Sequence, residues 1–89
     1  MNRPVGFVYF VRNTRSRAVK VGWSEKPAVR LGGLQVGCED ALALEATLPG
    51  TKKDEGVLHR ALAAEHVHGE WFRGPAVDAM VANLSRVAS

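Results

Sequence analysis

Two short apolar runs separated by a polar pentapeptide restrict the possible folds of this chain most strongly. Residues 5–12 (VGFVYFVR) and 18–23 (AVKVGW) are rich in β-branched and aromatic side chains, whereas the NTRSR segment between them is polar. Runs of this composition on either side of a short turn predict an antiparallel β-hairpin. Tyr9 lies within the first run and Lys20 within the second. These two side chains therefore either complete a face of the sheet or have a chemical role.

A helix is predicted to follow the hairpin, within residues 23–37. Ser24 is a candidate N-cap, Pro27 fits the first helical turn, and Gly37 provides a C-terminal stop. The adjacent Gly32 and Gly33 are unusual inside a helix, because each glycine costs about 0.5–1 kcal/mol relative to alanine. This cost suggests that another group approaches the backbone closely at these positions.

The second half of the chain predicts one more strand and two more helices. Residues 41–50 alternate leucine with other residues and end in a Pro-Gly turn, which is typical of a strand. Residues 51–66 begin with the capping candidates Thr51 and Asp54, and residues 74–88 form an amphipathic helix. We therefore predict an α+β fold: a small three-stranded antiparallel sheet flanked by helices, in the order β-β-α-β-α-α.

Length and composition favour one domain over residues 1–89. The 89 residues leave no room for a second core, and 46% apolar with 24% charged residues is typical of a globular protein. A single cysteine, Cys38, excludes an internal disulfide and fits a reducing cytoplasm. No apolar stretch approaches the roughly 18–20 residues that span a membrane, and the N-terminus lacks a signal-peptide pattern. We expect a cytoplasmic protein, for which the small core makes a homodimer a possible assembly.

The charge distribution favours a nucleic-acid partner. The net charge is +3, and positions 12–30 contain six basic residues but one acidic residue, Glu25. Such a patch most commonly binds nucleic acid, because phosphate neutralisation releases counterions. A solvated, arginine-rich turn is the alternative explanation. The six basic residues are Arg12, Arg15, Arg17, Lys20, Lys26 and Arg30.

A series of five short segments carries the most specific signal in the sequence. In chain order they are VYFV (8–11), VKVGWS (19–24), RLGGLQ (30–35), EGVLHRAL (55–62) and GEWF (69–72). Singly each segment is weak evidence, but at this spacing they resemble the GIY-YIG nuclease superfamily, most closely its small phage and bacterial members. The sequence departs from that pattern in the second segment, where Val19 or Lys20 stands in place of a tyrosine.

The resemblance implies an endonuclease, and elementary chemistry assigns roles to the matching residues. Phosphodiester hydrolysis needs a nucleophile, a cation near the leaving oxygen and positive charge around the phosphate. Arg30 can present its planar fork to phosphate oxygens, while Lys20 can add a point charge or favour ionisation of the Tyr9 phenol. His59 follows Glu55 by one helical turn and can contact phosphate or transfer a proton. The predicted catalytic set is Tyr9, Lys20, Arg30, Glu55 and His59.

The resemblance also implies a divalent cofactor, Mg²⁺ or another cation such as Mn²⁺. Glu55 is the first choice of ligand, because one carboxylate with waters and substrate oxygens suits Mg²⁺. Glu70 is the second choice, since superfamily members keep an acid before the tryptophan of the last segment. A zinc site built from His66, His68 and Glu70 is disfavoured, because the segment starts at a helix end and its ligands would not converge.

The predicted partner is DNA, contacted through its backbone with little sequence specificity. No predicted helix carries a set of base-reading side chains, so the hairpin and the start of the first helix would supply the contacts. The alternative function is a catalytically weakened GIY-YIG-like domain that acts as a nucleic-acid-binding or protein-interaction module. The predicted DNA-binding residues are Arg12, Arg15, Arg17 and Lys26.

Four of the predicted site residues also have purely structural explanations. For His59 this is a surface histidine with satisfied ring nitrogens, which is commoner than a catalytic one. Tyr9 fits a buried aromatic residue with a paired hydroxyl, and Arg30 fits a surface bridge to Glu25 or Asp40. An acid in a first helical turn, such as Glu55, is commonly explained by the helix dipole.

Overall fold

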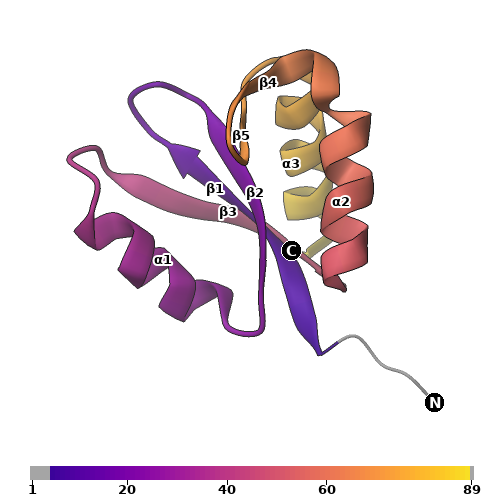
Figure 1. Ribbon diagram of the computed structural model, residues 1–89, viewed down its shortest axis with the longest axis horizontal. Coiled ribbons are helices and arrows are strands. Elements are labelled where there is room, and N and C mark those ends of the chain that lie inside the picture. Colours follow the sequence, from indigo (N-terminus) through magenta and orange to yellow (C-terminus); the bar gives the residue numbers. More distant parts are fainter. Residues whose placement is uncertain (1–4, 89) are drawn as a thin grey trace.

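The hairpin predicted from the sequence forms the centre of the sheet in the computed structural model, which describes residues 5–88 (Figure 1). The first strand, β1 (Gly6–Asn13), pairs antiparallel with β2 (Val19–Ser24). On its other side β1 pairs antiparallel with β3 (Leu42–Gly50), which is the third predicted strand. The α+β class agrees with the prediction, and the six predicted elements follow one another in the predicted order.

Two further short strands make the sheet larger than predicted. β4 (His66–His68) and β5 (Trp71–Phe72) form a small hairpin, and β5 pairs antiparallel with β2. The sheet therefore has five strands in the order β3-β1-β2-β5-β4, and the prediction of three strands was wrong. The HVHGEWF segment is too short to show strand alternation, and it becomes extended by pairing with the free edge of β2.

The helices cover both faces of the sheet. Figure 1 shows α1 (Pro27–Val36) on one side and α2 (Lys52–Ala61) with α3 (Pro75–Ala88) on the other. A short 3₁₀ turn, η1 (Ala63–Glu65), connects α2 to β4. No helix within residues 5–88 is long and apolar enough to cross a membrane.

The helix ends agree only partly with the sequence signals. Thr51 caps α2 as predicted: its side chain accepts from the Asp54 N–H, and the Asp54 carboxylate accepts from the Thr51 N–H. The N-cap of α1, however, is Lys26, and the Ser24 hydroxyl accepts from the Lys26 N–H in the preceding turn. A Cβ added at Gly32 or Gly33 would meet nothing within 4 Å among the described residues, so no group approaches the α1 backbone there.

The alternation of the central strands separates an apolar core from the opposite face of the sheet. Val8 and Phe10 of β1 and Val21 of β2 are fully buried under α2 and α3. The residues between them, Tyr9 on β1 and Lys20 on β2, point to the face that α1 covers. No residue of α1 is itself buried, but Tyr9 on the face that it covers is 1% exposed. The core also contains Val19, Ala46, Leu62, Phe72, Val77 and Val81.

Arg12 is a structural residue, and its assignment to the DNA surface was wrong. Its side chain is 6% exposed, and its guanidinium donates to Glu45 Oε1 at 2.9 Å and to Asp78 Oδ1 at 2.6 Å. A third bond runs to the Arg17 carbonyl at 2.8 Å. Burial opposes the charge, but the two carboxylates outweigh it and raise the pKa of Arg12. Arg12 therefore ties β1 to β3 and α3, and its charge is already neutralised.

We expect Arg12→Ala to lower the free energy of unfolding by about 1–3 kcal/mol, because it removes charge-assisted hydrogen bonds from a buried group. Urea denaturation measures this change. Arg15→Ala, three residues further along in the exposed turn, is the matched control and should change stability by less than about 0.5 kcal/mol. Equal effects of the two substitutions would contradict a structural role for Arg12.

Candidate functional site

Three potential metal-ligating side chains meet at the edge of β2, where its pairing with β5 ends. Glu55 and His59 lie one turn apart on α2, and Glu70 directly precedes β5. One ligand atom from each residue lies within 4.8 Å of the others. The Val21 N–H donates to the Glu70 carbonyl at 2.9 Å, which fixes the start of β5 beside α2. This Glu55–His59–Glu70 cluster contains both the first and the second choice of metal ligand.

A backbone hydrogen bond orients the His59 ring. Its Nε2 lies 2.7 Å from the Val21 carbonyl oxygen, and a carbonyl only accepts, so Nε2 carries the hydrogen. In the neutral ring Nδ1 is then the remaining acceptor. The Phe72 ring packs against His59 edge to face, with 5.0 Å between ring centroids. His59 is therefore held in one orientation and keeps one nitrogen for a proton or a ligand.

Glu55 is a buried acid in an environment that disfavours its charge. The residue is 7% exposed, although it lies in the first turn of α2. Burial raises the pKa of the Glu55 carboxyl, and the neighbouring Glu70 carboxylate raises it further. His59, Lys52 and Lys20 act in the opposite direction but do not cancel these two effects. A helix-dipole acid would be exposed, so the dipole alone does not explain Glu55.

Lys20 supports the cluster through Glu70. Its ammonium lies 3.2 Å from Glu70 Oε1 and 5.8 Å from the centroid of the Trp71 ring. The Lys20 side chain is only 14% exposed, so this ion pair is partly shielded from water. Lys20 thus balances part of the negative charge of the cluster.

The Tyr9 side chain lies over Gly22 on the neighbouring strand. A Cβ at Gly22 would lie 2.3 Å from the Tyr9 hydroxyl oxygen, so any larger residue would displace the ring. Tyr9 is 1% exposed, and its hydroxyl forms no hydrogen bond with the described residues. Tyr9 is therefore a buried aromatic residue, as its structural explanation predicts, and its catalytic role stays a prediction.

Arg30 is exposed on α1, and its place at the site stays a prediction. Within residues 5–88 its side chain forms no ion pair, so the alternative bridges to Glu25 or Asp40 are not made. Asp40 instead accepts a hydrogen bond from Asn13 at 3.1 Å. Arg30 is thus free to bind an anion, in contrast to Arg12.

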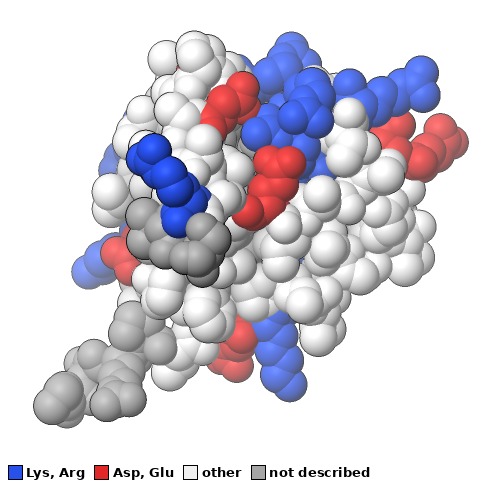
Figure 2. Space-filling view, turned by 180° about the vertical axis from the view of Figure 1, so that it is seen from behind, with Lys and Arg blue, Asp and Glu red and all other residues white. Residues whose placement is uncertain are grey.

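The remaining basic residues of the predicted DNA surface are exposed. Arg15 and Arg17 lie in the β1–β2 turn, and Lys26 precedes α1. Figure 2 shows the molecule from behind, with Lys and Arg side chains gathered at the end where this turn lies in Figure 1 and acidic side chains between them. His66 and His68 lie outside the cluster, and His66 Nε2 contacts the Gly69 carbonyl at 2.9 Å.

Sequence reasoning missed three features of this site. The Val21 carbonyl that orients His59 is a backbone group, and no side-chain pattern reveals it. The packing of the Tyr9 ring against Gly22 was also missed, although a glycine inside a strand often marks a site where another group approaches the backbone closely. The contact of the half-buried Trp71 with Lys20 was missed as well, because it depends on the pairing of β5 with β2.

Fold and site together define an α+β domain with a carboxylate–imidazole cluster at the edge of a central antiparallel hairpin. Residues 6–88 match the family model of the T5orf172 domain, so the chain belongs to this family. The matched span contains every strand and helix described above and all members of the cluster. No curated protein and no solved structure matches the chain significantly.

The raised pKa of Glu55 predicts that this residue destabilises the fold at neutral pH. Above the ordinary pKa of 4.5 the unfolded chain ionises Glu55 freely, whereas the folded chain resists this charge. We expect Glu55→Gln to raise the urea midpoint at neutral pH, and the gain should shrink as the pH falls toward and below 4.5. The exposed Glu25→Gln is the matched control and should show no such trend. A less stable Glu55→Gln protein at neutral pH would contradict the dominance of burial.

Proposed function

We propose that this protein is a divalent-metal-dependent endonuclease that cleaves DNA phosphodiester bonds. The single observation that carries the proposal is the Glu55–His59–Glu70 cluster, with its three ligand atoms within 4.8 Å of one another. Membership of the T5orf172 family supports a nuclease-like or DNA-binding role. The resemblance of its sequence segments to the GIY-YIG superfamily supports cleavage.

The donor set of the cluster fits a divalent cation. Two carboxylates and an imidazole nitrogen suit Mn²⁺, and the carboxylates alone suit Mg²⁺ with waters in its other positions. The position of Glu55 fits as well, because burial and then repulsion from Glu70 raise its pKa, and a cation would offset both effects. When bound, such a cation stabilises the negative charge of the phosphate and of the leaving oxygen.

Tyr9 and Arg30, which the predicted catalytic set adds to the cluster, would position the substrate and take part in proton transfer together with His59. The Tyr9 hydroxyl, which lies over Gly22 on the neighbouring strand, would take part in activating the attacking water. His59 can accept a proton at Nδ1, because its Nε2–H is committed to the Val21 carbonyl. Arg30 would bind two phosphate oxygens through its fork, since no described carboxylate occupies it.

Basic residues outside the cluster would hold the DNA backbone. Arg15 and Arg17 in the β1–β2 turn and Lys26 before α1 are exposed and suited to phosphate contacts. Contacts of this kind position a duplex but do not read its sequence.

A non-catalytic binding module is the second candidate function. The Lys20–Glu70 ion pair at 3.2 Å favours it, because it neutralises one carboxylate of the cluster without a metal ion. Lys20 also lies at or beside the position where the GIY-YIG superfamily, which the sequence resembles, has a tyrosine. In this function the basic residues bind nucleic acid and the cluster has a structural role.

Nicking of a supercoiled plasmid tests the proposal. We expect Mg²⁺ or Mn²⁺ to support nicking, and Glu55→Gln to reduce the rate by at least about 10²-fold, by analogy with the loss of one charge-stabilising group. Tyr9→Phe should reduce the rate without loss of DNA binding, since only the hydroxyl is removed. Glu25→Gln is the control with an exposed acid outside the cluster.

Two outcomes would contradict the proposed nuclease. Salt-sensitive DNA binding without nicking in either metal would support the binding module. Nicking that persists at full rate in Glu55→Gln would place the catalytic centre elsewhere or reveal a contaminating nuclease.

A further inference from the structure

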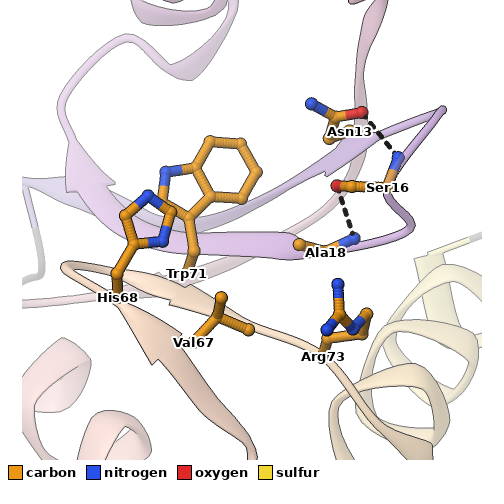
Figure 3. A pocket seen from close by; sticks show the side chains of 7 residues that line it. All are labelled: Asn13, Ser16, Ala18, Val67, His68, Trp71 and Arg73. Atoms are coloured by element: carbon orange, nitrogen blue, oxygen red, sulfur yellow. Dashed lines mark hydrogen bonds between the residues drawn. The ribbon is translucent and has the colours of Figure 1, made fainter.

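A hollow of about 280 Å³ opens between the β1–β2 turn and the β4–β5 hairpin (Figure 3). It lies outside the Glu55–His59–Glu70 cluster but begins at Trp71, the residue that follows Glu70. Its volume is just below the roughly 300–1,000 Å³ of pockets that enclose drug-sized ligands, so it suits one small planar unit. Its lining residues are Asn13, Ser16, Ala18, Val67, His68, Trp71 and Arg73.

One side of the hollow is aromatic. Figure 3 shows the Trp71 indole along this side, with the His68 ring next to it. Trp71 is half-buried and lies opposite Lys20 in the β2–β5 pairing, which fixes its strand position. His68 is exposed and makes no hydrogen bond with the described residues. The side thus offers a flat aromatic surface that no other part of residues 5–88 covers completely.

The other side of the hollow offers a cation and a hydroxyl. The Arg73 side chain is exposed and forms no ion pair within the described residues. The Ser16 hydroxyl accepts from the Ala18 N–H at 3.2 Å, so its own hydrogen remains available for donation. Asn13 offers nothing more, because its amide is engaged by Asp40 and by the turn backbone. Arg15 and Arg17 extend the positive charge along the turn.

We infer that this hollow binds one unpaired nucleotide of single-stranded DNA, with its base stacked on Trp71 and its phosphate at Arg73. Every base has a π face, so an aromatic surface beside cations selects single strands without selecting a sequence. A paired base would first have to leave its stack, which costs a few kcal/mol. The inference rests on the proposed function in taking nucleic acid as the ligand.

The position of the hollow next to the Glu55–His59–Glu70 cluster suggests which DNA substrates the protein prefers. Trp71 directly follows Glu70 of the cluster, and the Lys20 ammonium contacts both residues. Through Trp71 and Lys20, a nucleotide stacked in the hollow would adjoin the β4–β5 hairpin, which carries Glu70 of the cluster. The preferred substrate class is DNA with unpaired nucleotides next to the cleaved bond, such as a single strand or a frayed end.

Equilibrium binding without divalent metal tests the inference separately from cleavage. A labelled single strand and the matching duplex are titrated with protein in chelating buffer, and fluorescence anisotropy gives both affinities. We expect the native chain to prefer the single strand. Trp71→Ala should weaken single-strand binding about five- to hundredfold and leave duplex binding nearly unchanged. Trp71→Phe, which keeps an aromatic face, should retain most of the preference, and the exposed Val57→Ala is the neutral control.

Photocrosslinking of the unmodified protein provides a second measurement if Trp71→Ala fails to fold. A single strand that contains 5-iodouracil should crosslink to Trp71, because this chemistry favours stacked aromatic side chains. Crosslinking to other residues only, or equal single-strand binding by folded Trp71→Ala, would overturn the inference.

The outcomes separate the two proposals. Trp71-dependent single-strand binding without nicking keeps the nucleotide site and rejects the nuclease. Metal-dependent nicking with no effect of Trp71→Ala on binding keeps the nuclease and rejects the nucleotide site. Absence of all DNA binding rejects both.

Discussion

The antiparallel pairing of β1 with β2 is the constraint on which the rest of the structure depends. It sets Tyr9 opposite Gly22 and thereby divides the side chains between two faces. Val8, Phe10 and Val21 form the face that binds α2 and α3, and this packing brings Glu55 and His59 to the edge of β2. The same edge accepts β5 and so positions Glu70. The β1–β2 hairpin thus forms the centre of the core and positions the three residues of the Glu55–His59–Glu70 cluster.

The candidate site brings together charged side chains whose burial, one by one, would destabilise the fold. Buried Glu55 lies beside Glu70, and repulsion between them adds to the cost of burial. Lys20 pairs with Glu70, and the Val21 carbonyl holds His59 in place, so the cluster is pre-organised before anything binds. A fold that retains a buried acid without a full partner gives up stability at that position, which is a common property of functional sites.

The sequence predicted the parts of the structure that local chemistry determines. The hairpin, the third strand and the Thr51–Asp54 capping box follow from apolar alternation, turn residues and side-chain caps. The strands β4 and β5 could not be predicted in this way, because so few residues show no alternation and pairing with β2 alone makes them extended.

The same distinction applies to the site residues. Arg12 and Arg15 look alike in the sequence, but the carboxylates that neutralise Arg12 come from positions 45 and 78. The approach of Glu70 to Glu55 likewise depends on tertiary contacts, so the sequence left these acids as alternatives although the structure brings them together.

The most direct test of the account is a crystal structure from Mn²⁺-soaked crystals with anomalous diffraction measured. We predict an anomalous peak bound by Glu55 and Glu70 at the edge of β2. A Mn²⁺ peak bound only elsewhere, or none while the two acids remain together, would contradict a metal-binding role for the cluster.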